Sequence, residues 1–202
     1  ICGGVPARIF RISFTGESSF EINVPAGYGL ELWQEVMKAG QEFNLTPYGT
    51  EVMHLLRAEK GFIIVGQDTD GTITPHDLNM DWIVSKKKDF IGKRSLFRQD
   101  MLREDRKKLV GLKTKDPAIV LEEGGQIVAP TAGHAKPVPM IGHVTSSYYS
   151  PTLDRSIALA LLKGGMDREG ETVSIDQGGE HRIDADVVSP FFVDPEGKKF
   201  HE

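Results

Sequence analysis

The stretch MIGHVTSSYYSPTLDRSIALALL, residues 140–162, decides the fold of the second half of this chain. It contains two runs of residues that favour β-strands, separated by a turn-forming segment that begins with proline. Shorter runs of the same kind lie on either side of it, and glycine or proline separates them: LVGLKT, QIVA, ETVSI and HRIDADVV. Strands that recur about every 10–15 residues with turn signals between them are typical of a small antiparallel barrel or sandwich.

The first half of the chain mixes helical and extended patterns. Apolar residues recur at helical spacing in 29–43 and again in 51–60, where Thr50 is a suitable N-cap and Gly61 a suitable stop. Short apolar runs at 62–65 and 82–84 favour strands. Residues 89–105 predict a further helix, with Leu96, Phe97, Met101 and Leu102 on its apolar side.

The charged stretch from Arg103 to Lys108 separates these two patterns. We therefore expect two domains: an α+β part over residues 1–105 and an antiparallel β-barrel over residues 106–202. The length of 202 residues is sufficient for both parts to build a core.

Composition excludes several classes of function. The formal net charge of −5 argues against an electrostatic nucleic-acid binder. No apolar run approaches the roughly 20 residues that a membrane-spanning helix needs. Cys2 is the only cysteine, so an internal disulfide and a zinc site built on several thiolates are both excluded, and we expect a cytoplasmic protein. The chain opens at Ile1 almost directly into a strand, and we expect it to be a piece of a longer polypeptide.

The familiar catalytic and nucleotide-binding motifs are missing. The sequence has no Walker A loop, no GxGxxG, no HExxH and no GxSxG. The segment from Asp68 to Gly71 begins like a calcium loop, but the glycine comes too early and Asn79 stands where the loop needs a glutamate. We interpret that segment as a polar turn.

The segment RISFTGESSFEINVP, residues 11–25, predicts a β-hairpin whose loop is TGESS. Alternation places Phe10, Ile12 and Phe14, and likewise Phe20, Ile22 and Val24, on a face toward a core, with Glu21 and Asn23 on the reverse face. On this pattern alone Glu21 is a solvent-facing strand residue. The alternative is a cleft with aromatic walls, because an ionised carboxylate accepts two parallel hydrogen bonds from a flat heterocycle.

Four segments carry a family resemblance, in the same order and with the same spacing. FTGESSFEINVP resembles the YTGE-x-G-x-E signature of the glycine-cleavage T-protein family, the aminomethyltransferases. LLRAEKGF with GQDTDGTITP resembles that family's LRLEAG and GxDxD segments, and DWIVSKKKDFIGKRSL resembles its FxGxxxL segment. IGHVTSSYYSPTLDRSIALALL resembles a segment of its C-terminal barrel. The resemblance implies part of a ferredoxin-like folate-binding module followed by the barrel.

Three further segments resemble one branch of this family. VPARIFRISFTGE, MHLLRAEKGF and SPFFVDPEG look like the module that ends the alpha subunit of heterotetrameric sarcosine oxidases. Sarcosine dehydrogenase and dimethylglycine oxidase carry similar modules. In such enzymes a flavin oxidises the N-methyl group and tetrahydrofolate takes up the one-carbon unit as 5,10-methylenetetrahydrofolate. FAD, FMN and NAD would bind outside these residues, and the implied partners are the upstream alpha-subunit domains and the beta, gamma and delta subunits.

The resemblance gives Glu21 a role, because it matches the family glutamate that holds the pterin ring of tetrahydrofolate. Phe10 and Tyr28 are further candidates, for stacking on that ring. The chain departs from the family at Phe14, which replaces a tyrosine, and at Met53, which replaces an arginine. The family's catalytic aspartate would lie upstream of Ile1, so we expect no catalytic residue here and no turnover by these residues alone.

Two other functions remain open at this point. A non-catalytic module that holds subunits together would explain the departures at Phe14 and Met53, since its folate pocket would have decayed. A true glycine-cleavage aminomethyltransferase is the other. A folate-dependent protein of iron–sulfur or RNA chemistry is disfavoured, because the chain has no K-G-C-Y-x-G-Q motif.

Overall fold

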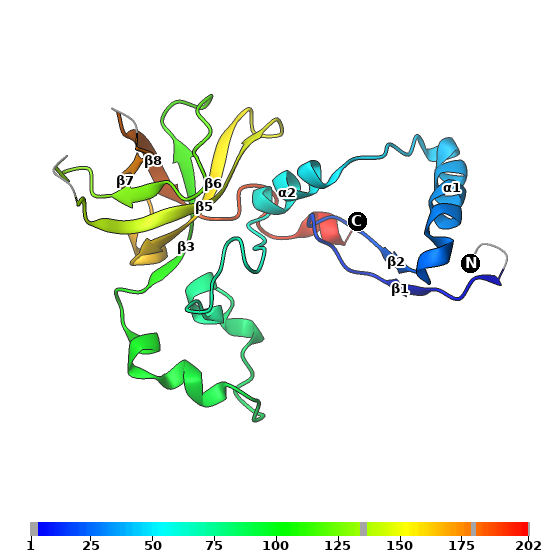
Figure 1. Cartoon of the computed structure of the whole chain (residues 1–202), viewed down its shortest axis with the longest axis horizontal. Coiled ribbons are helices and arrows are strands. Elements are labelled where there is room, and N and C mark those ends of the chain that lie inside the picture. Colours follow the sequence, from blue (N-terminus) through cyan, green and yellow to red (C-terminus); the bar gives the residue numbers. More distant parts are fainter. Residues whose placement is uncertain (1–3, 134–136, 179–180, 202) are drawn as a thin grey trace. The chain divides into compact units, whose positions relative to one another are not determined.

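The computed structural model describes residues 4–133, 137–178 and 181–201, and Cys2 lies outside them. The chain forms two compact units, one of residues 1–57 with 196–202 and one of residues 58–195 (Figure 1). Among the described residues, no helix combines the length and apolar character needed to cross a membrane.

Six strands of the described residues close into a barrel in the second unit. They are β3 (Lys107–Thr114), β4 (Gln126–Val128), β5 (Met140–Ser150), β6 (Arg155–Lys163), β7 (Thr172–Asp176) and β8 (Ile183–Val188). Each strand pairs antiparallel with its neighbours in the order β3-β6-β5-β4-β7-β8. The antiparallel barrel expected from the sequence is confirmed.

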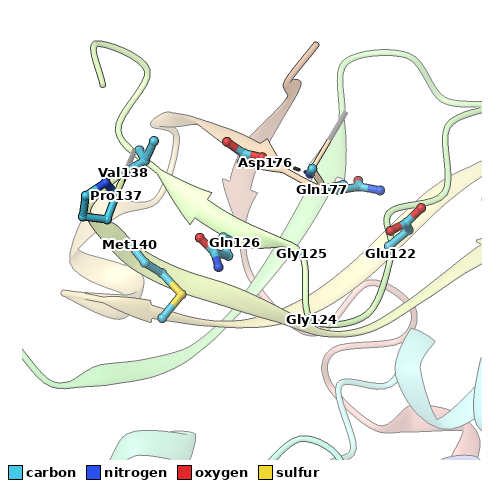
Figure 2. Close-up of a pocket in the computed structure, with 10 residues that line it drawn as sticks. Glu122, Gly124, Gly125, Gln126, Pro137, Val138, Met140, Asp176 and Gln177 are labelled. Atoms are coloured by element: carbon cyan, nitrogen blue, oxygen red, sulfur yellow. Dashed lines mark hydrogen bonds between the residues drawn. The ribbon is translucent and has the colours of Figure 1, made fainter. Parts of the chain in front are cut away.

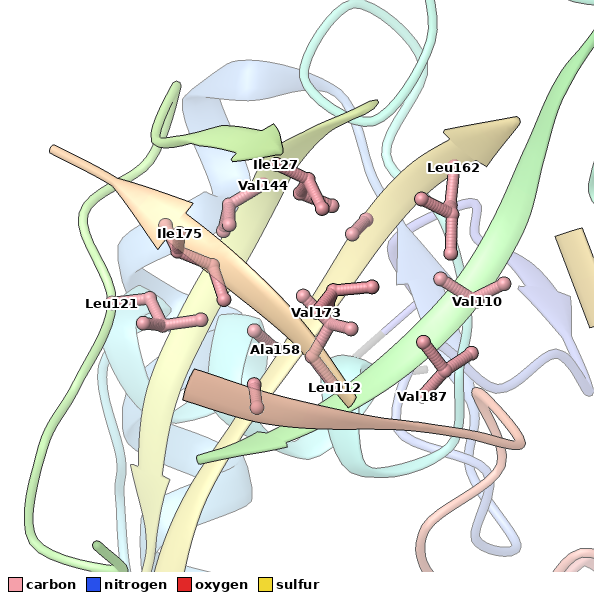
Figure 3. Packing of buried hydrophobic residues seen from close by; sticks show 12 residues of the cluster. Val110, Leu112, Leu121, Ile127, Val144, Ala158, Leu162, Val173, Ile175 and Val187 are labelled. Carbon is pink, nitrogen blue, oxygen red and sulfur yellow. The ribbon is translucent and has the colours of Figure 1, made fainter. Parts of the chain in front are cut away.

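The interior of the barrel is a closely packed apolar core (Figure 3). Alternate residues of each strand point inward, such as Val110 and Leu112 of β3 and Val173 and Ile175 of β7. Gly111 lies between two of these residues, and a Cβ atom there would come within 2.4 Å of the Ser189 carbonyl oxygen. Only glycine therefore lets the chain after β8 run this close to β3.

A second apolar cluster covers one outer face of the same barrel. Leu109 of β3 and Leu159 and Leu161 of β6 pack there against Ala58 and Leu78. Because β6 is covered on both faces, its sequence is a continuous apolar run and not an alternating one. Residues 58–80 are thereby fixed to the barrel.

A β-bulge in β5 fastens the loop that contains Asp68. The register between β5 and β6 shifts between Val144 and Ser146, which leaves Thr145 as the extra residue. The hydroxyls of Thr145 and Ser146 each donate to Asp68 Oδ1 at 2.6 Å, and the Ile64 amide donates to Oδ2 at 2.8 Å. Asp68 is fully buried. The carboxylate that resembles the start of a calcium loop therefore holds the loop to the barrel.

Three elements expected between residues 62 and 105 are wrong. Residues 62–65 form an isolated bridge from Val65 to Thr69 and no strand. Residues 81–83 form a short 3-10 helix, Asp81–Ile83, where a strand was expected. Instead of one helix over 89–105 there are two 3-10 helices, Lys93–Phe97 and Gln99–Leu102, separated by an extended Arg98. Phe97 and Leu102 stay exposed, and a helix without a packed apolar face gains little stability.

The first unit contains the predicted hairpin, one whole helix and a second helix up to its last two residues, which belong to the second unit. The strands β1 (Arg8–Phe10) and β2 (Glu21–Asn23) are short. They precede α1 (Gly29–Ala39), which continues as the 3-10 helix Gly40–Phe43, and α2 (Thr50–Glu59). The apolar side of α1 forms as expected but is not covered by the described residues, and Trp33 is 54% exposed.

The end of the chain returns to the hairpin. Arg11 donates to the Phe200 carbonyl oxygen at 3.1 Å, and its guanidinium lies 5.5 Å from the centre of the Phe200 ring. Lys199 pairs with Glu17 at 3.4 Å. These contacts explain why residues 196–202 belong to the first compact unit and not to the unit that holds the barrel.

Candidate functional site

The register of the hairpin places Phe10 directly opposite Glu21, and Ile9 directly opposite Ile22. Residues that face each other across antiparallel strands have their side chains on the same face. Phe10 therefore lies on the face of Glu21 and Asn23, and the expectation that Phe10 and Glu21 lie on opposite faces of the hairpin is wrong. The prediction assumed that the strands continue to the TGESS loop. The connection instead spans residues 11–20, so the alternation of residues 10–14 does not continue along one strand.

A hollow of about 300 Å³ opens beside Glu21. Most of its wall comes from the long hairpin connection, and the rest comes from the segment before α2 and from α2 itself. The lining residues are Ile12, Ser13, Phe14, Thr15, Ser19, Phe20, Glu21, Tyr48 and Met53. Its volume is at the lower end of the range for small-molecule sites.

The wall formed by the connection is held in shape by hydrogen bonds. The Gly16 amide donates to Ser13 Oγ at 2.7 Å, and Gly16 has a φ of +83°, which a residue with a side chain rarely adopts. Ser19 Oγ donates to the Glu17 carbonyl oxygen at 3.1 Å. The TGESS sequence thus folds as a tight polar turn that leaves Phe14 and Phe20 in the wall.

Glu21 is the charged residue of this lining. Asn23 Nδ2 donates to Glu21 Oε1 at 2.8 Å, which is the contact expected between residues two apart on one strand face. Both side chains are exposed. The amide holds one carboxylate oxygen and so limits the directions in which the carboxylate accepts hydrogen bonds from a ligand.

The two aromatic residues singled out from the sequence lie near the hollow in sequence but do not line it. Phe10 is 40% exposed and lies opposite Glu21, while Tyr28 is 43% exposed and precedes the first turn of α1. The aromatic lining comes instead from Phe14, Phe20 and Tyr48. Tyr48 is separated from the hairpin by α1, so no local pattern could have pointed to it.

The chemistry of the hollow follows from its lining. The lining includes one carboxylate and no cationic side chain. It therefore favours a ligand with hydrogen-bond donors and disfavours an anion. Aromatic and apolar side chains on the walls favour a flat ring. Among the described residues, no group of three or more histidine, cysteine, aspartate or glutamate side chains could hold a metal ion.

A larger hollow of about 810 Å³ lies on the barrel, beside β4 and β7 (Figure 2). It contains two carboxylates, Glu122 and Asp176, and no aromatic ring among its lining residues. Asp176 accepts from the Gly178 amide at 3.0 Å and pairs with Arg182 at 3.4 Å. Its carboxylate is thus used within the loop, and this hollow offers less recognition chemistry than the one beside Glu21.

The fold agrees with the comparisons to known proteins. A model of the GCVT N-terminal domain matches residues 1–88, and a model of the glycine cleavage T-protein C-terminal barrel domain matches residues 107–194. The chain belongs to the glycine-cleavage T-protein family.

Three relatives show where in this family the similarity lies. The chain is 54% identical over 197 residues to the sarcosine oxidase subunit alpha of Corynebacterium sp. strain U-96, covering 97% of this chain and 20% of the relative. It is 33% identical over 175 residues to the aminomethyltransferase of Thermoanaerobacter pseudethanolicus, covering 85% of this chain and 45% of the relative. The crystal structure of the glycine cleavage system aminomethyltransferase T from Bartonella henselae matches with a TM-score of 0.77 and 26% identity, over 93% of this chain and 50% of that chain.

The chain therefore spans about a fifth of the sarcosine oxidase alpha subunit and about half of the aminomethyltransferases that it matches.

Proposed function

We propose that this chain binds a reduced folate at the hollow beside Glu21. The observation that carries the proposal is a carboxylate at the edge of a hollow with aromatic walls. The reduced pterin ring of tetrahydrofolate is flat and has a ring N–H next to an exocyclic amine. An ionised carboxylate suits this pair of donors, because its two oxygens accept two parallel hydrogen bonds.

The residues around Glu21 fit such a ring. Asn23 fixes the orientation of the carboxylate, and Phe14, Phe20 and Tyr48 offer faces or edges for stacking. Phe10 and Tyr28 remain candidates for contact with parts of the folate outside the hollow. Met53 adds apolar surface and no charge, which suits an uncharged ring.

We further propose that the whole protein is a sarcosine oxidase and that this chain is the C-terminal portion of its alpha subunit. The 54% identity to a relative of that name supports this reading. Tetrahydrofolate would accept the one-carbon unit from the N-methyl group of sarcosine and leave as 5,10-methylenetetrahydrofolate. The flavins and NAD would bind outside this chain, whose own residues bind and orient the folate and do not catalyse the oxidation.

The apolar surface of the first unit supports the proposal of protein partners. Trp33 and Leu30 of α1 and Ile9 and Ile22 of the hairpin are exposed in the described residues. An apolar surface of this kind is usually covered by protein. The upstream alpha-subunit domains and the beta, gamma and delta subunits are the partners that we propose. A nucleic acid or a membrane is not proposed, and we place the assembly in the cytoplasm.

The same exposed surface favours a second function, that of a non-catalytic module for subunit assembly. In that case the hollow beside Glu21 would be empty in the working enzyme. A third function, a glycine-cleavage aminomethyltransferase, is supported by the 33% identity to a relative with that name. An assay with an aminomethyl-loaded lipoyl carrier protein separates the third function from the first two.

The product of the intact oxidase tests the proposed function. Without bound folate, the released one-carbon unit is formaldehyde. We expect the wild-type enzyme to form 5,10-methylenetetrahydrofolate at limiting tetrahydrofolate, and the Glu21→Gln variant to release mainly formaldehyde at an unchanged rate of sarcosine oxidation. Glu35→Gln, the same change at an exposed position of α1, is the control and should behave as wild type. Equal product ratios in wild type and Glu21→Gln would favour the assembly module.

A further inference from the structure

Two lysines lie directly opposite each other on the outer face of the barrel. Lys107 of β3 and Lys163 of β6 are partners in the strand register. Like charges at directly opposite positions of an antiparallel pair destabilise the sheet. A cross-strand lysine pair is therefore an arrangement that an anion between the two ammonium groups would relieve.

A histidine joins this pair from the third strand. His143 of β5 faces Leu161 of β6, which places its ring on the same outer face as the two lysines. Its Nδ1 atom lies 3.5 Å from Lys107 Nζ. Three neighbouring strands thus direct three nitrogen-bearing side chains toward one place.

These side chains line a hollow of about 230 Å³, and the buried Leu161 also lines it. Two arginines line the same hollow, but their charges are already used. Arg103 pairs with Asp100 and Asp105, both at 2.8 Å, and Arg106 pairs with the buried Asp77 at 2.7 Å. Within the described part of the chain, neither Lys107 nor Lys163 forms an ion pair.

The three carboxylates that line the hollow are also satisfied by other groups, and the first of them, Asp100, accepts from Arg103 at 2.8 Å and from Arg106 at 3.4 Å. Asp70 Oδ1 accepts from the Thr72 amide at 2.8 Å and from the Thr72 hydroxyl at 2.6 Å. Asp105 accepts two hydrogen bonds from Arg103, at 2.8 and 2.9 Å. These bonds lower the pKa of the Asp70 and Asp105 carboxyl groups, so both are ionised at neutral pH. They attract the lysines from a distance but leave the ammonium hydrogens available.

We propose that Lys107, Lys163 and His143 form a binding site for a small oxyanion, a carboxylate or phosphate group of a ligand. Each lysine supplies a charge-assisted hydrogen bond, and the imidazole supplies a third donor when it is protonated. Thr72 lines the hollow and adds a hydroxyl. This site is separate from the hollow beside Glu21 and does not depend on folate binding.

The surroundings of His143 predict how the site depends on pH. Partial burial lowers the pKa of His143, the positive charge of Lys107 lowers it further, and the negative charge of Asp70 raises it. The other charged groups of the same hollow are the cations Lys163, Arg103 and Arg106 and the carboxylates Asp100 and Asp105. A bound oxyanion would offset the effect of Lys107 and raise the pKa of His143. Binding therefore takes up a proton and becomes tighter as the pH falls below neutrality.

Calorimetric titration of the intact chain tests the site, with inorganic phosphate in one arm and glutarate in the other. Titrations at pH 6.2 and 8.0 in two buffers of different ionisation enthalpy report the affinity and the proton uptake. NMR spectra of chain with labelled histidine report the His143 ring. We expect saturable binding in at least one arm, proton uptake at pH 6.2 in the glutarate arm, where the anion is already largely ionised, and a His143 pKa that rises when the anion binds. The arm that binds more tightly identifies phosphate or carboxylate as the preferred group.

Neutral variants identify the residues. Lys163→Gln and Lys107→Gln should each weaken binding about tenfold, the usual effect of losing one charge-assisted hydrogen bond. Lys115→Gln is the control, since Lys115 is an exposed lysine paired with Asp186 and lies outside the hollow. Lys163 is exposed at the end of β6, so unfolding curves should stay unchanged in its variant. The proposal is overturned if neither anion shifts the His143 signals saturably, or if Lys115→Gln weakens binding as much as Lys163→Gln.

Discussion

Phe10 lies directly opposite Glu21 across the hairpin, and both side chains are on one face. The pairing puts an aromatic ring beside the Glu21 carboxylate, although the alternation of residues 10–14 and 20–24 predicted that the two side chains lie on opposite faces. A shift of a single residue in register would have sent the two side chains to opposite faces. The proposed folate site therefore depends on the length of the connection between β1 and β2.

Tyr48 should contribute more to folate affinity than Phe43. Tyr48 lines the hollow, and Phe43 does not. Losing an aromatic contact of this kind costs about 0.5–1.5 kcal/mol, so we expect Tyr48→Ala to weaken binding roughly two- to tenfold. Phe43→Ala is the matched control, because it removes an exposed aromatic ring of the same unit that does not line the hollow and is not a candidate folate contact. Equal losses in the two variants would mean that the hollow is not where the ring binds.

Phe10 can be tested in the same assay. Phe10→Leu keeps an apolar side chain opposite Glu21 and removes the ring, so a loss of affinity reports stacking and not the stability of the hairpin. We expect a loss of about threefold. Ile9→Leu changes the residue next to it, on the other face of β1, and should leave the affinity unchanged.

Asp68 should be important for the stability of the second unit. Replacing it by alanine leaves the buried hydroxyls of Thr145 and Ser146 without the carboxylate that accepts their hydrogen bonds. We expect the free energy of unfolding to fall by about 3 kcal/mol. Denaturant unfolding measures this loss, and Asp116→Ala is the control because its carboxylate is exposed and, among the described residues, accepts only from the backbone amide two residues away. A loss below about 1 kcal/mol would show that the bulge in β5 holds the loop without this carboxylate.

The pair of Asp77 and Arg106 predicts sensitivity to acid. Burial by itself raises the pKa of Asp77, but hydrogen bonds from Arg106 and Thr74 outweigh it, and the pKa lies below its ordinary value of 3.8. A group with a lowered folded-state pKa stabilises the fold fully above its unfolded-state pKa, and this stability is lost as the pH falls through the folded-state pKa.

We therefore expect the unfolding free energy of the wild type to decline below about pH 4, more steeply than that of Asp77→Asn. At pH 7 the variant should be less stable by about 3 kcal/mol, since it removes the nearer carboxylate partner of the largely buried Arg106, at 2.7 Å, and leaves it Asp100 at 3.4 Å. Parallel pH profiles of the two proteins would contradict this account of the pair.

The sequence predicted the barrel well and the segment before it poorly, because local preferences agree with burial in the folded chain only in the barrel. In 140–162 the local sequence favours two strands and a turn, and the fold buries β6 on both faces. Local and tertiary preferences therefore favour the same structure. In 81–105 the apolar spacing is helical, but no described residue covers Phe97 or Leu102, and the segment forms two short 3-10 helices.

The candidate site was predicted in part. Glu21 was identified by its place in a family motif, whereas Tyr48 is brought to the hollow by the path of the chain through α1 and could not be inferred from spacing. The role of Asp68 depends on a bulge 77 residues away, and the register shift that creates a bulge has no signature in a run of β-favouring residues. Long-range contacts thus account for most of what the sequence left undetermined.

The most direct test of the central claim is the affinity of the intact parent enzyme for tetrahydrofolate, measured by calorimetry under reducing conditions. If Glu21 accepts the two hydrogen bonds of the pterin edge, Glu21→Gln should bind roughly ten- to a hundredfold more weakly than wild type, while Glu35→Gln binds equally well. An unchanged affinity in Glu21→Gln, with wild type still binding folate, would place the folate elsewhere and contradict the account.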